Sequence, residues 1–292
     1  WTPAPAKSLE GEPVITTLAD VTPHPVEWLW PSRIALGKLT LIVGDPGLGK
    51  SFITLDLAGR VSRGTSWPDN PEVRRAPGGV VLLSAEDDLA DTIRPRLDAA
   101  GADVSRIAAI TTVKRYDFEK GKDVFEPFSL TDHLPALERA IQQVGDCRLV
   151  VIDPISAYLG GTDSHKNAEI RGLLAPLSDL AARHGVALVG VTHLRKGEGP
   201  AMYRAMGSLA FVAAARAAYC VTRDKDDLSG QRRFLLPVKN NIGNDRDGLA
   251  YRLDATFSTN AQAVVTWESE PVSITADQAL RPDTGRRGED DT

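Results

Sequence analysis

The chain has 292 residues, a formal net charge of −5 and a pI of about 5.6. Hydrophobic residues make up 42% and charged residues 25%, which excludes a fibrous repeat and bulk disorder and allows one large folded domain. The acidic balance repels nucleic acid overall, so any nucleic-acid site must be local.

No apolar run approaches the ~20 residues of a bilayer-spanning helix, and the first residues lack a signal-peptide pattern. We therefore expect a cytoplasmic protein with no membrane partner. Cys147 and Cys220 show no CxxC spacing, so we expect neither a disulfide nor a zinc site. The first residue is Trp1 rather than Met, which suggests a chain cut from a longer protein.

Residues 1–27 are Pro-rich and predict an N-terminal arm or linker. Short Val/Ile/Leu-rich runs then alternate with helical patterns. This alternation predicts an α/β fold in which a mainly parallel sheet is flanked by helices. The expected strands cover residues 39–43, 79–86, 106–113, 148–153 and 186–193, and the expected helices cover 51–61, 89–100, 133–144 and 168–184.

The pattern changes at residue 217. Four further apolar runs, over residues 217–224, 232–240, 249–255 and 263–269, are separated by polar turns such as "DDLSG" and "NDRDG". Such runs predict C-terminal antiparallel hairpins appended to the parallel core. We expect one domain over residues 28–270, followed by a flexible C-terminal tail over 271–292.

The segment "GDPGLGKS" matches the P-loop pattern in full, and an apolar strand precedes it while a helical pattern follows it. Backbone N–H groups at a helix N-terminus then converge on phosphates, Lys50 reaches the β and γ phosphates, and Ser51 ligates Mg²⁺. The alternative is a Gly-rich turn with an incidental lysine. The expected nucleotide contacts are Gly44, Asp45, Pro46, Gly47, Leu48, Gly49, Lys50, Ser51 and Phe52.

Two further carboxylates fit this chemistry. Asp153 ends the apolar run "RLVVID" and is the expected second anchor for Mg²⁺, although it could also cap a turn before Pro154. Glu86 ends the first strand after the P-loop helix, and strand ends of a parallel sheet share one crevice. We expect Glu86 to orient the attacking water and Asp88 to cap the next helix. The alternative is that Glu86, Asp87 and Asp88 all only cap that helix.

A catalytic glutamate on the strand after the P-loop helix, ahead of the later aspartate, resembles the RecA/DnaB class of P-loop ATPases. The chain is similar in particular to RepA-type hexameric replicative helicases and related AAA-type phage and plasmid ATPases. The likeness covers residues 28–267 and rests on "GDPGLGKS", "SAEDD", "VVIDP", "GVTHLRKG", "MGSLAFVAAAR" and "RRFLLPVKNNIG". It implies a RecA-like core, ATP and Mg²⁺ as cofactors, a hexameric homo-oligomeric ring, single-stranded DNA, and a primase or other replication partner.

The same resemblance assigns two more catalytic residues beside Lys50 and Glu86. His193 corresponds to the histidine that senses the γ-phosphate, and Arg216, nine residues after Gly207, corresponds to the arginine finger that enters a neighbouring subunit's site. Two plainer interpretations stay open. His193 could be a strand-end histidine without a role, and Arg216, within an apolar stretch, could pair with an acid of its own chain.

By analogy with RecA-type loops, residues 160–167 and 195–204 would face a central channel, so the nucleic-acid candidates are Lys166, Arg195, Lys196, Arg204 and Lys239. As solvated loops they need no function. The chain departs from the resemblance at Ile242, where a tyrosine is expected, and at Asn241, where DnaB-type proteins have an arginine. We find no basic face interleaved with aromatic residues, so stacking on bases is unsupported beyond Tyr203.

Three functions follow. The first is a ring-forming, Mg-ATP-dependent DNA helicase or translocase of a plasmid, phage or integrated element. The second is a RecA-like ATP-dependent switch or scaffold that does not translocate, which the acidic charge and Asn241 favour. The third is the ATPase segment of a larger primase-helicase.

Overall fold

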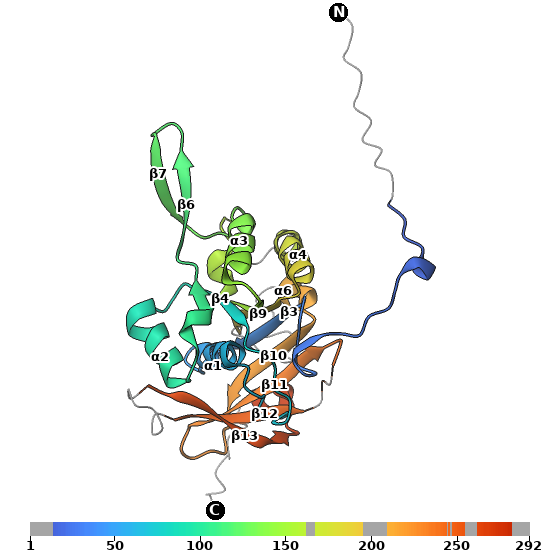
Figure 1. Cartoon of the computed structure of the whole chain (residues 1–292). Coiled ribbons are helices and arrows are strands. Elements are labelled where there is room, and N and C mark those ends of the chain that lie inside the picture. The colour runs from blue at the N-terminus through green and yellow to red at the C-terminus, as the bar shows by residue number, and fades with distance from the viewer. Residues whose placement is uncertain are drawn as a thin grey trace, which may run out of the picture.

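The computed structural model describes residues 14–161, 167–194, 209–243, 245, 247–254 and 262–281. Its centre is a nine-stranded sheet of order β13-β12-β11-β10-β3-β9-β8-β4-β5 (Figure 1). The strands are β3 (Leu39–Gly44), β4 (Gly79–Ser84), β5 (Ile107–Ala109), β8 (Cys147–Asp153), β9 (Ala187–His193), β10 (Ala217–Arg223), β11 (Arg232–Asn240), β12 (Gly248–Asp254) and β13 (Val264–Val272).

The sheet has a parallel and an antiparallel part, which confirms the predicted α/β architecture. All neighbouring strands from β10 to β5 pair in parallel, and β10 to β13 pair antiparallel. One detail differs from the prediction. β10 does not only start the C-terminal hairpins, because it also pairs in parallel with β3 and joins the two parts.

Helices cover both faces of the sheet. They are α1 (Lys50–Arg63), α2 (Arg94–Ala99), α3 (Leu134–Val144), α4 (Asn167–His184), α6 (Leu209–Ala214) and α7 (Ala276–Leu280). One buried cluster lies between the sheet and α3, α4, α6 and α7, and a second lies between the sheet and α1 and α2. Short turns of 3-10 helix cover Leu18–Asp20, Val104–Arg106 and Ile155–Tyr158.

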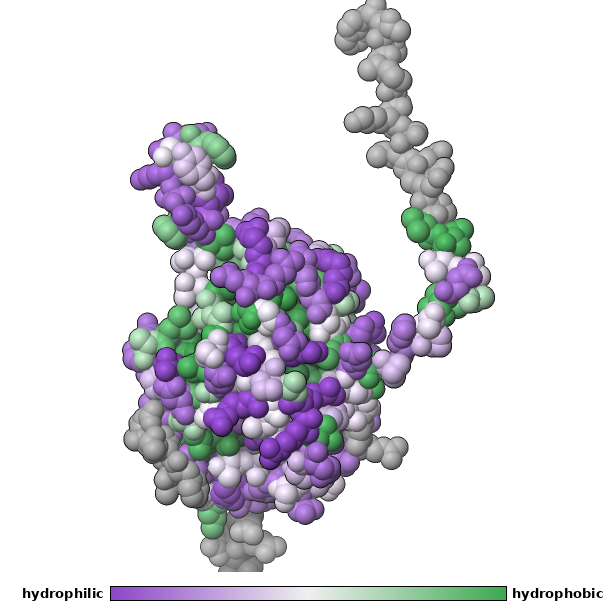
Figure 2. All heavy atoms as spheres, in the orientation of Figure 1, coloured by the Kyte–Doolittle hydropathy of each residue, from purple (hydrophilic) through white to green (hydrophobic). Residues whose placement is uncertain are grey.

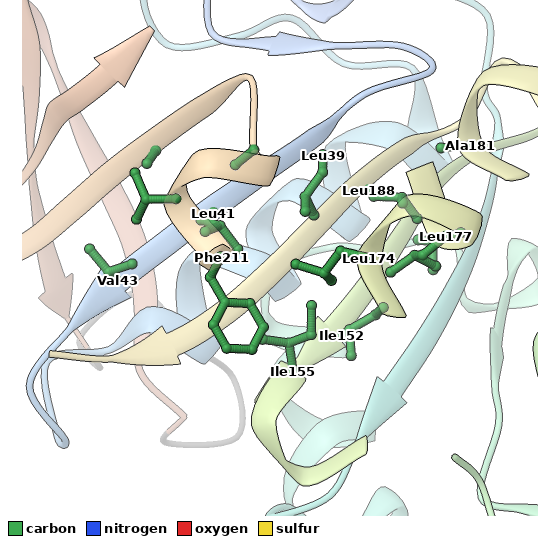
Figure 3. Packing of buried hydrophobic residues seen from close by; sticks show 14 of the residues in the cluster. Leu39, Leu41, Val43, Ile152, Ile155, Leu174, Leu177, Ala181, Leu188 and Phe211 are labelled. Carbon is green, nitrogen blue, oxygen red and sulfur yellow. The ribbon is translucent and has the colours of Figure 1, made fainter. Parts of the chain in front are cut away.

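Alternation along the central strands fills both clusters. Leu39, Leu41 and Val43 of β3 point into the first cluster, where Figure 3 shows them beside Leu174 of α4 and Phe211 of α6. The intervening Ile42 belongs to the second cluster. Because both faces are buried, these strands are apolar at nearly every position, which is the pattern that the sequence displayed.

A tryptophan cluster fastens the chain's entry to the domain. Trp30, in the small sheet of β1 (Trp28–Trp30) and β2 (Ile34–Ala35), stacks on Trp67 with ring centroids 4.9 Å apart and meets Trp267 edge-on. The Trp30 indole N–H donates to Asp69, whose carboxylate also pairs with the buried Arg33 at 2.7 Å. Aromatic packing and a buried ion pair therefore hold β1 to β13.

Two predicted elements differ in detail. Residues 89–100 form a π-helical turn, Leu89–Ile93, before α2, because Pro95 has no N–H for an α-helical bond there. The strand predicted over 106–113 ends at Ala109. The chain then leaves the sheet and forms a hairpin of β6 (Thr112–Asp117) and β7 (Lys122–Pro127), which the sequence analysis missed.

The ends of the domain also differ from the expected boundaries in one respect. Residues 14–27 are exposed and run away from the body, as an arm would (Figure 1). The segment expected as a tail from residue 271 still belongs to the fold through residue 280. There β13 ends at Val272, and α7, with a capping box at Thr275, buries Ala276 and Ala279 against the core.

Candidate nucleotide-binding site

The loop between β3 and α1 has the backbone conformation of a phosphate cradle. Gly47 and Gly49 have φ of +75° and +84°, a region that residues with a Cβ rarely adopt. At Gly44 an added Cβ would lie 2.6 Å from the Val221 carbonyl oxygen, and at Gly49 it would lie 2.5 Å from Leu253 Cδ1. These three glycines are therefore required by the turn and by its packing against the C-terminal strands.

Lys50 lies buried at the start of α1. Its ammonium donates to the carbonyl oxygens of Gly44 at 3.0 Å and Asp45 at 2.9 Å, and it lies 3.5 Å from Nδ1 of His193. Burial lowers the pKa of Lys50, while the charges of Asp153 and Glu86 act in the opposite direction. The two carbonyls thus hold the ammonium over the cradle, where a phosphate would supply the balancing charge.

Asp153 and Ser51 form an oxygen-rich pair beside Lys50. Asp153 ends β8 and is paired in register with Ser84, the last residue of β4. Burial raises the pKa of Asp153, opposed by a hydrogen bond from Ser51 and by the charge of Lys50. A carboxylate and a hydroxyl beside a phosphate cradle are hard oxygen ligands, so these residues fit Mg²⁺ shared with nucleotide phosphates.

Glu86 and His193 approach each other at the carboxyl ends of β4 and β9. Glu86 Oε1 lies 3.8 Å from His193 Nε2, and the Glu86 side chain is 63% exposed, so water reaches it. Its two acidic neighbours are engaged elsewhere. Asp87 pairs with Arg96 at 3.0 Å, and Asp88 accepts hydrogen bonds from Ala90 and Asp91 as the predicted N-cap. Glu86 is thus the acid of this run that faces the cradle.

The C-terminal strands support the cradle in a way that sequence reasoning missed. The Tyr251 hydroxyl of β12 donates to the Leu48 carbonyl at 3.2 Å, and Val221 and Leu253 pack on the loop's glycines. Phe52, an expected nucleotide contact, instead lies under the guanidinium of Arg96 at 4.4 Å. No local signal could reveal the Tyr251 contact, because the two residues are 203 positions apart.

Arg216 lies at the opposite end of the sheet from the P-loop of its own chain. Its N–H donates to the carbonyl of Leu39, the first residue of β3, whereas the cradle follows Gly44 at the other end of that strand. At ~3.3 Å per residue the two ends are roughly 15 Å apart. The side chain is exposed and has no ion-pair partner among the described residues, so the intrachain salt bridge expected as an alternative is absent there.

Lys239 is occupied within the fold. Its ammonium donates to the carbonyls of Val212 at 2.8 Å and Ala215 at 2.7 Å, at the C-terminal end of α6. Burial, and then the charge of Arg216, lower the pKa of Lys239. These contacts give Lys239 a helix-capping role. The other nucleic-acid candidates, Lys166, Arg195, Lys196 and Arg204, lie outside the described residues.

One negative statement of the sequence analysis was wrong. The β6–β7 hairpin does interleave aromatic and basic side chains, because Tyr116, Phe118 and Phe125 are exposed beside Lys114 and Arg115. Its residues were not recognised as strands, so their shared face could not be seen. Cys147 and Cys220 are both buried free thiols. Within the described ranges, no helix is long and apolar enough to cross a membrane.

The P-loop between β3 and α1, with Asp153 and Glu86 on neighbouring strand ends of this sheet, defines a RecA/DnaB-type P-loop ATPase domain. The chain belongs to the AAA domain family, whose model matches residues 5–199. Both findings confirm the class that the sequence resembled.

Individual proteins agree with this assignment. The chain is 27% identical to DNA repair protein RadA of Mycobacterium tuberculosis over 72% of this chain and 36% of RadA. It is 28% identical to DNA repair protein RAD51 homolog 4 of Mus musculus over 70% of this chain and 60% of that protein. It therefore spans about a third and three fifths of these relatives. The solved ATPase domain of a helicase has the same fold, with a TM-score of 0.54 and 15% identity, covering 78% of this chain and 84% of that domain.

Proposed function

We propose that this domain hydrolyses Mg-ATP in a ring, hexameric by its RepA-type resemblance, and moves along single-stranded DNA as a helicase or translocase of a plasmid, phage or integrated element. The observation that carries the proposal is the separation of Arg216 from the P-loop of its own chain. An exposed arginine roughly 15 Å away along β3 cannot contact phosphates in that loop. It can complete only the site of a neighbouring copy.

Each described site residue then has a role. Lys50 and the P-loop N–H groups hold the phosphates, and Ser51 and Asp153 hold Mg²⁺, which when bound neutralises charge on the phosphate oxygens. Glu86 orients the water that attacks the γ-phosphorus. Arg216 of a neighbouring copy stabilises the charge that develops as the bond to the bridging oxygen breaks. Asp45, Pro46 and Leu48 shape the cradle.

Coupling to DNA passes through His193 in this proposal. Its imidazole lies between Lys50 and Glu86, and the chain continues from it into residues 195–204. A change at the γ-phosphate alters what His193 contacts, and its movement shifts that segment. We assign DNA contact to Lys166, Arg195, Lys196 and Arg204, and not to Lys239, whose ammonium is bound by carbonyls.

The test compares ATP hydrolysis with and without single-stranded DNA, for the wild type and for Arg216→Ala, at concentrations where mass measurements report assembly. We expect DNA to raise the wild-type rate and the variant to lose roughly 10³-fold while still binding nucleotide. Arg171→Ala, an exposed arginine on α4, is the matched control. Mixing Arg216→Ala with Lys50→Ala should restore activity, since each copy supplies what the other lacks. A rate insensitive to DNA and to Arg216 would overturn the proposal.

A second candidate is an ATP-dependent switch or scaffold without translocation. The engagement of Lys239 with α6 favours it, because that removes one expected DNA contact, as does the net charge of −5. Slow turnover that follows oligomeric state but ignores DNA would support this candidate, and strand separation would exclude it. In either case the chain can be the ATPase segment of a larger protein such as a primase-helicase, which the full reading frame would test.

A further inference from the structure

The β6–β7 hairpin projects from the body and exposes aromatic side chains (Figures 1 and 2). Phe118 is 89% exposed, Phe125 68% and Tyr116 49%. Tyr116 and Phe118 meet edge to face with ring centroids 5.0 Å apart. Lys114 is paired with Phe125 and Tyr116 with Asp123, so these residues share one face of the two-stranded sheet. The hairpin thus offers an aromatic surface that nothing in the described domain covers.

The charges of the hairpin cancel. Residues 112–127 contain four basic and four acidic side chains. Three pairs are formed within the hairpin, namely Lys114 with Asp123, Arg115 with Glu126, and Lys120 with Asp117. A neutral, aromatic surface lacks the excess of cations that a phosphate backbone attracts, and aromatic side chains are enriched where proteins contact proteins. The hairpin therefore fits a protein surface better than a nucleic acid.

The tip is apolar at its centre and acidic on either side. Phe118 stands between Asp117 and Glu119. The Asp117 carboxylate accepts hydrogen bonds from the N–H groups of Glu119 and Lys120, which fixes the turn and presents Phe118 outward. The Glu119 carboxylate has no ion-pair partner among the described residues. A complementary surface would hold an apolar depression beside unpaired cations.

Such a depression exists elsewhere on this chain. A pocket of about 280 Å³ has apolar lining from Leu29, Leu36, Val61 and Trp67, and four arginines line it as well, Arg60, Arg74, Arg75 and Arg148. Arg60 and Arg148 pair with Asp56 and Asp146, each at 2.8 Å. Arg74 and Arg75 are exposed and have no partner within the part of the chain that the structure describes. In a chain of net charge −5, this concentration of arginines stands out.

The hairpin and the pocket lie toward opposite ends of the parallel strands. The hairpin follows Ala109 at the carboxyl end of β5, the end that also carries the P-loop on β3. Arg148 lies at the start of β8, and Arg216 precedes β10, so pocket and Arg216 share the amino end. A head-to-tail contact between copies brings one copy's hairpin toward the next copy's pocket. The same stacking brings Arg216 toward the neighbouring P-loop.

We propose that the hairpin tip of one copy inserts Phe118 into the arginine-lined pocket of a second copy, with Glu119 against Arg74 and Arg75. The contact joins two different surfaces, so its repetition generates a ring or a filament. It shares head-to-tail stacking with the proposed ring, but it requires neither DNA nor ATP hydrolysis, and it can be tested without them.

Disulfide trapping in the full chain tests the contact directly. Phe118→Cys is combined with Thr65→Cys, an exposed position that lines the pocket, and both native thiols are buried. After mild oxidation we expect a ladder of dimers and larger species that neither single variant forms as a ladder. Leu228→Cys with Thr65→Cys is the matched control, because Leu228 is also fully exposed on a turn. No ladder, or an equal ladder in the control, overturns the proposal.

Charge reversal tests the pairing and guards against misfolding. Glu119→Arg and Arg75→Glu should each weaken self-association by roughly 10-fold, measured by sedimentation at several concentrations. The double variant should recover most of that loss, because the pair is re-formed with reversed sign. Arg171→Glu on α4 is the control that should leave association unchanged. Unchanged singles, or a double variant no better than its parents, overturns the pairing. Trapping without any DNA effect on hydrolysis would uphold this contact while rejecting the proposed motor.

Discussion

Nε2 of His193 lies 3.8 Å from Oε1 of Glu86, and Nδ1 of the same ring lies 3.5 Å from the Lys50 ammonium. These residues come from β9, the end of β4 and the start of α1. The imidazole therefore touches both the group proposed to orient water and the group proposed to hold the phosphates. This arrangement allows the phosphate state to be sensed and the water to be positioned at one place.

Glu86→Gln should abolish hydrolysis and spare nucleotide binding. An amide of the same size keeps the site's shape but cannot accept a proton from water, so we expect a loss of roughly 10²–10⁴-fold in rate. The checks are steady-state hydrolysis and binding of a fluorescent nucleotide. Asp88→Asn is the matched control, since asparagine is also a good N-cap. Equal losses in both variants would contradict a special role for Glu86.

His193→Asn should separate hydrolysis from its response to DNA. Asparagine retains a hydrogen-bonding group near Lys50 but cannot span from Lys50 to Glu86 as the ring does. We expect the basal rate to fall less than 10-fold, as a rough bound for a residue that does not itself move a proton, and the stimulation by single-stranded DNA to disappear. A variant stimulated as strongly as the wild type would remove His193 from the coupling path.

Asp153→Asn should stabilise the nucleotide-free protein while abolishing Mg-dependent hydrolysis. Burial raises the pKa of Asp153 above its ordinary value, so the folded protein binds this proton more readily than the unfolded chain does. The charged form therefore costs stability at neutral pH, and its removal should raise the free energy of unfolding by roughly 1 kcal/mol.

The sign of the pH dependence checks the cause. As pH falls through the raised pKa, the wild type gains a proton that relieves its buried charge, so its deficit relative to Asp153→Asn should shrink and vanish below the unfolded pKa. Urea unfolding of both proteins across acidic pH, without magnesium, measures this difference. A constant difference would show that the buried charge is not the cause.

Lys239→Met should destabilise the fold without weakening DNA binding. The change removes hydrogen bonds to the last carbonyls of α6 and should lower the free energy of unfolding by about 1–2 kcal/mol. Urea unfolding and DNA titration measure the two effects. Lys122→Met, an exposed lysine of the hairpin, should change neither. Weaker DNA binding at unchanged stability would return Lys239 to the nucleic-acid surface.

Asp69→Asn should lower the free energy of unfolding by about 3 kcal/mol, because it leaves the guanidinium of Arg33 buried without its partner. Asp98→Asn breaks an exposed pair with Arg94 and should cost about 0.5 kcal/mol at most. Tryptophan fluorescence during urea unfolding reports both. Burial raises the pKa of Asp69, but the Arg33 charge and the hydrogen bonds outweigh it and lower the pKa overall. Its stabilisation is therefore full above the unfolded pKa and lost as pH falls through the lowered one.

Local chemistry determined much of this protein from sequence alone. The spacing of Gly44, Gly49 and Lys50 between a strand and a helix predicted the phosphate cradle, since only glycines allow its turn and a helix N-terminus attracts phosphate. Continuous apolar runs predicted strands buried on both faces. Acids at strand ends predicted the neighbours of Lys50, because parallel strands end at a common edge.

Tertiary structure decided what depends on partners far along the chain. The parallel pairing of β10 with β3 puts Arg216 at the far end from its own P-loop, and no local pattern distinguishes that pairing from a hairpin. The carbonyls that bind Lys239, the support of Leu48 by Tyr251, and the meeting of Leu29, Trp67 and Arg148 in one pocket join residues far apart in sequence. Such contacts follow from how the sheet orders its strands, which sums over the whole chain and is encoded in no single segment.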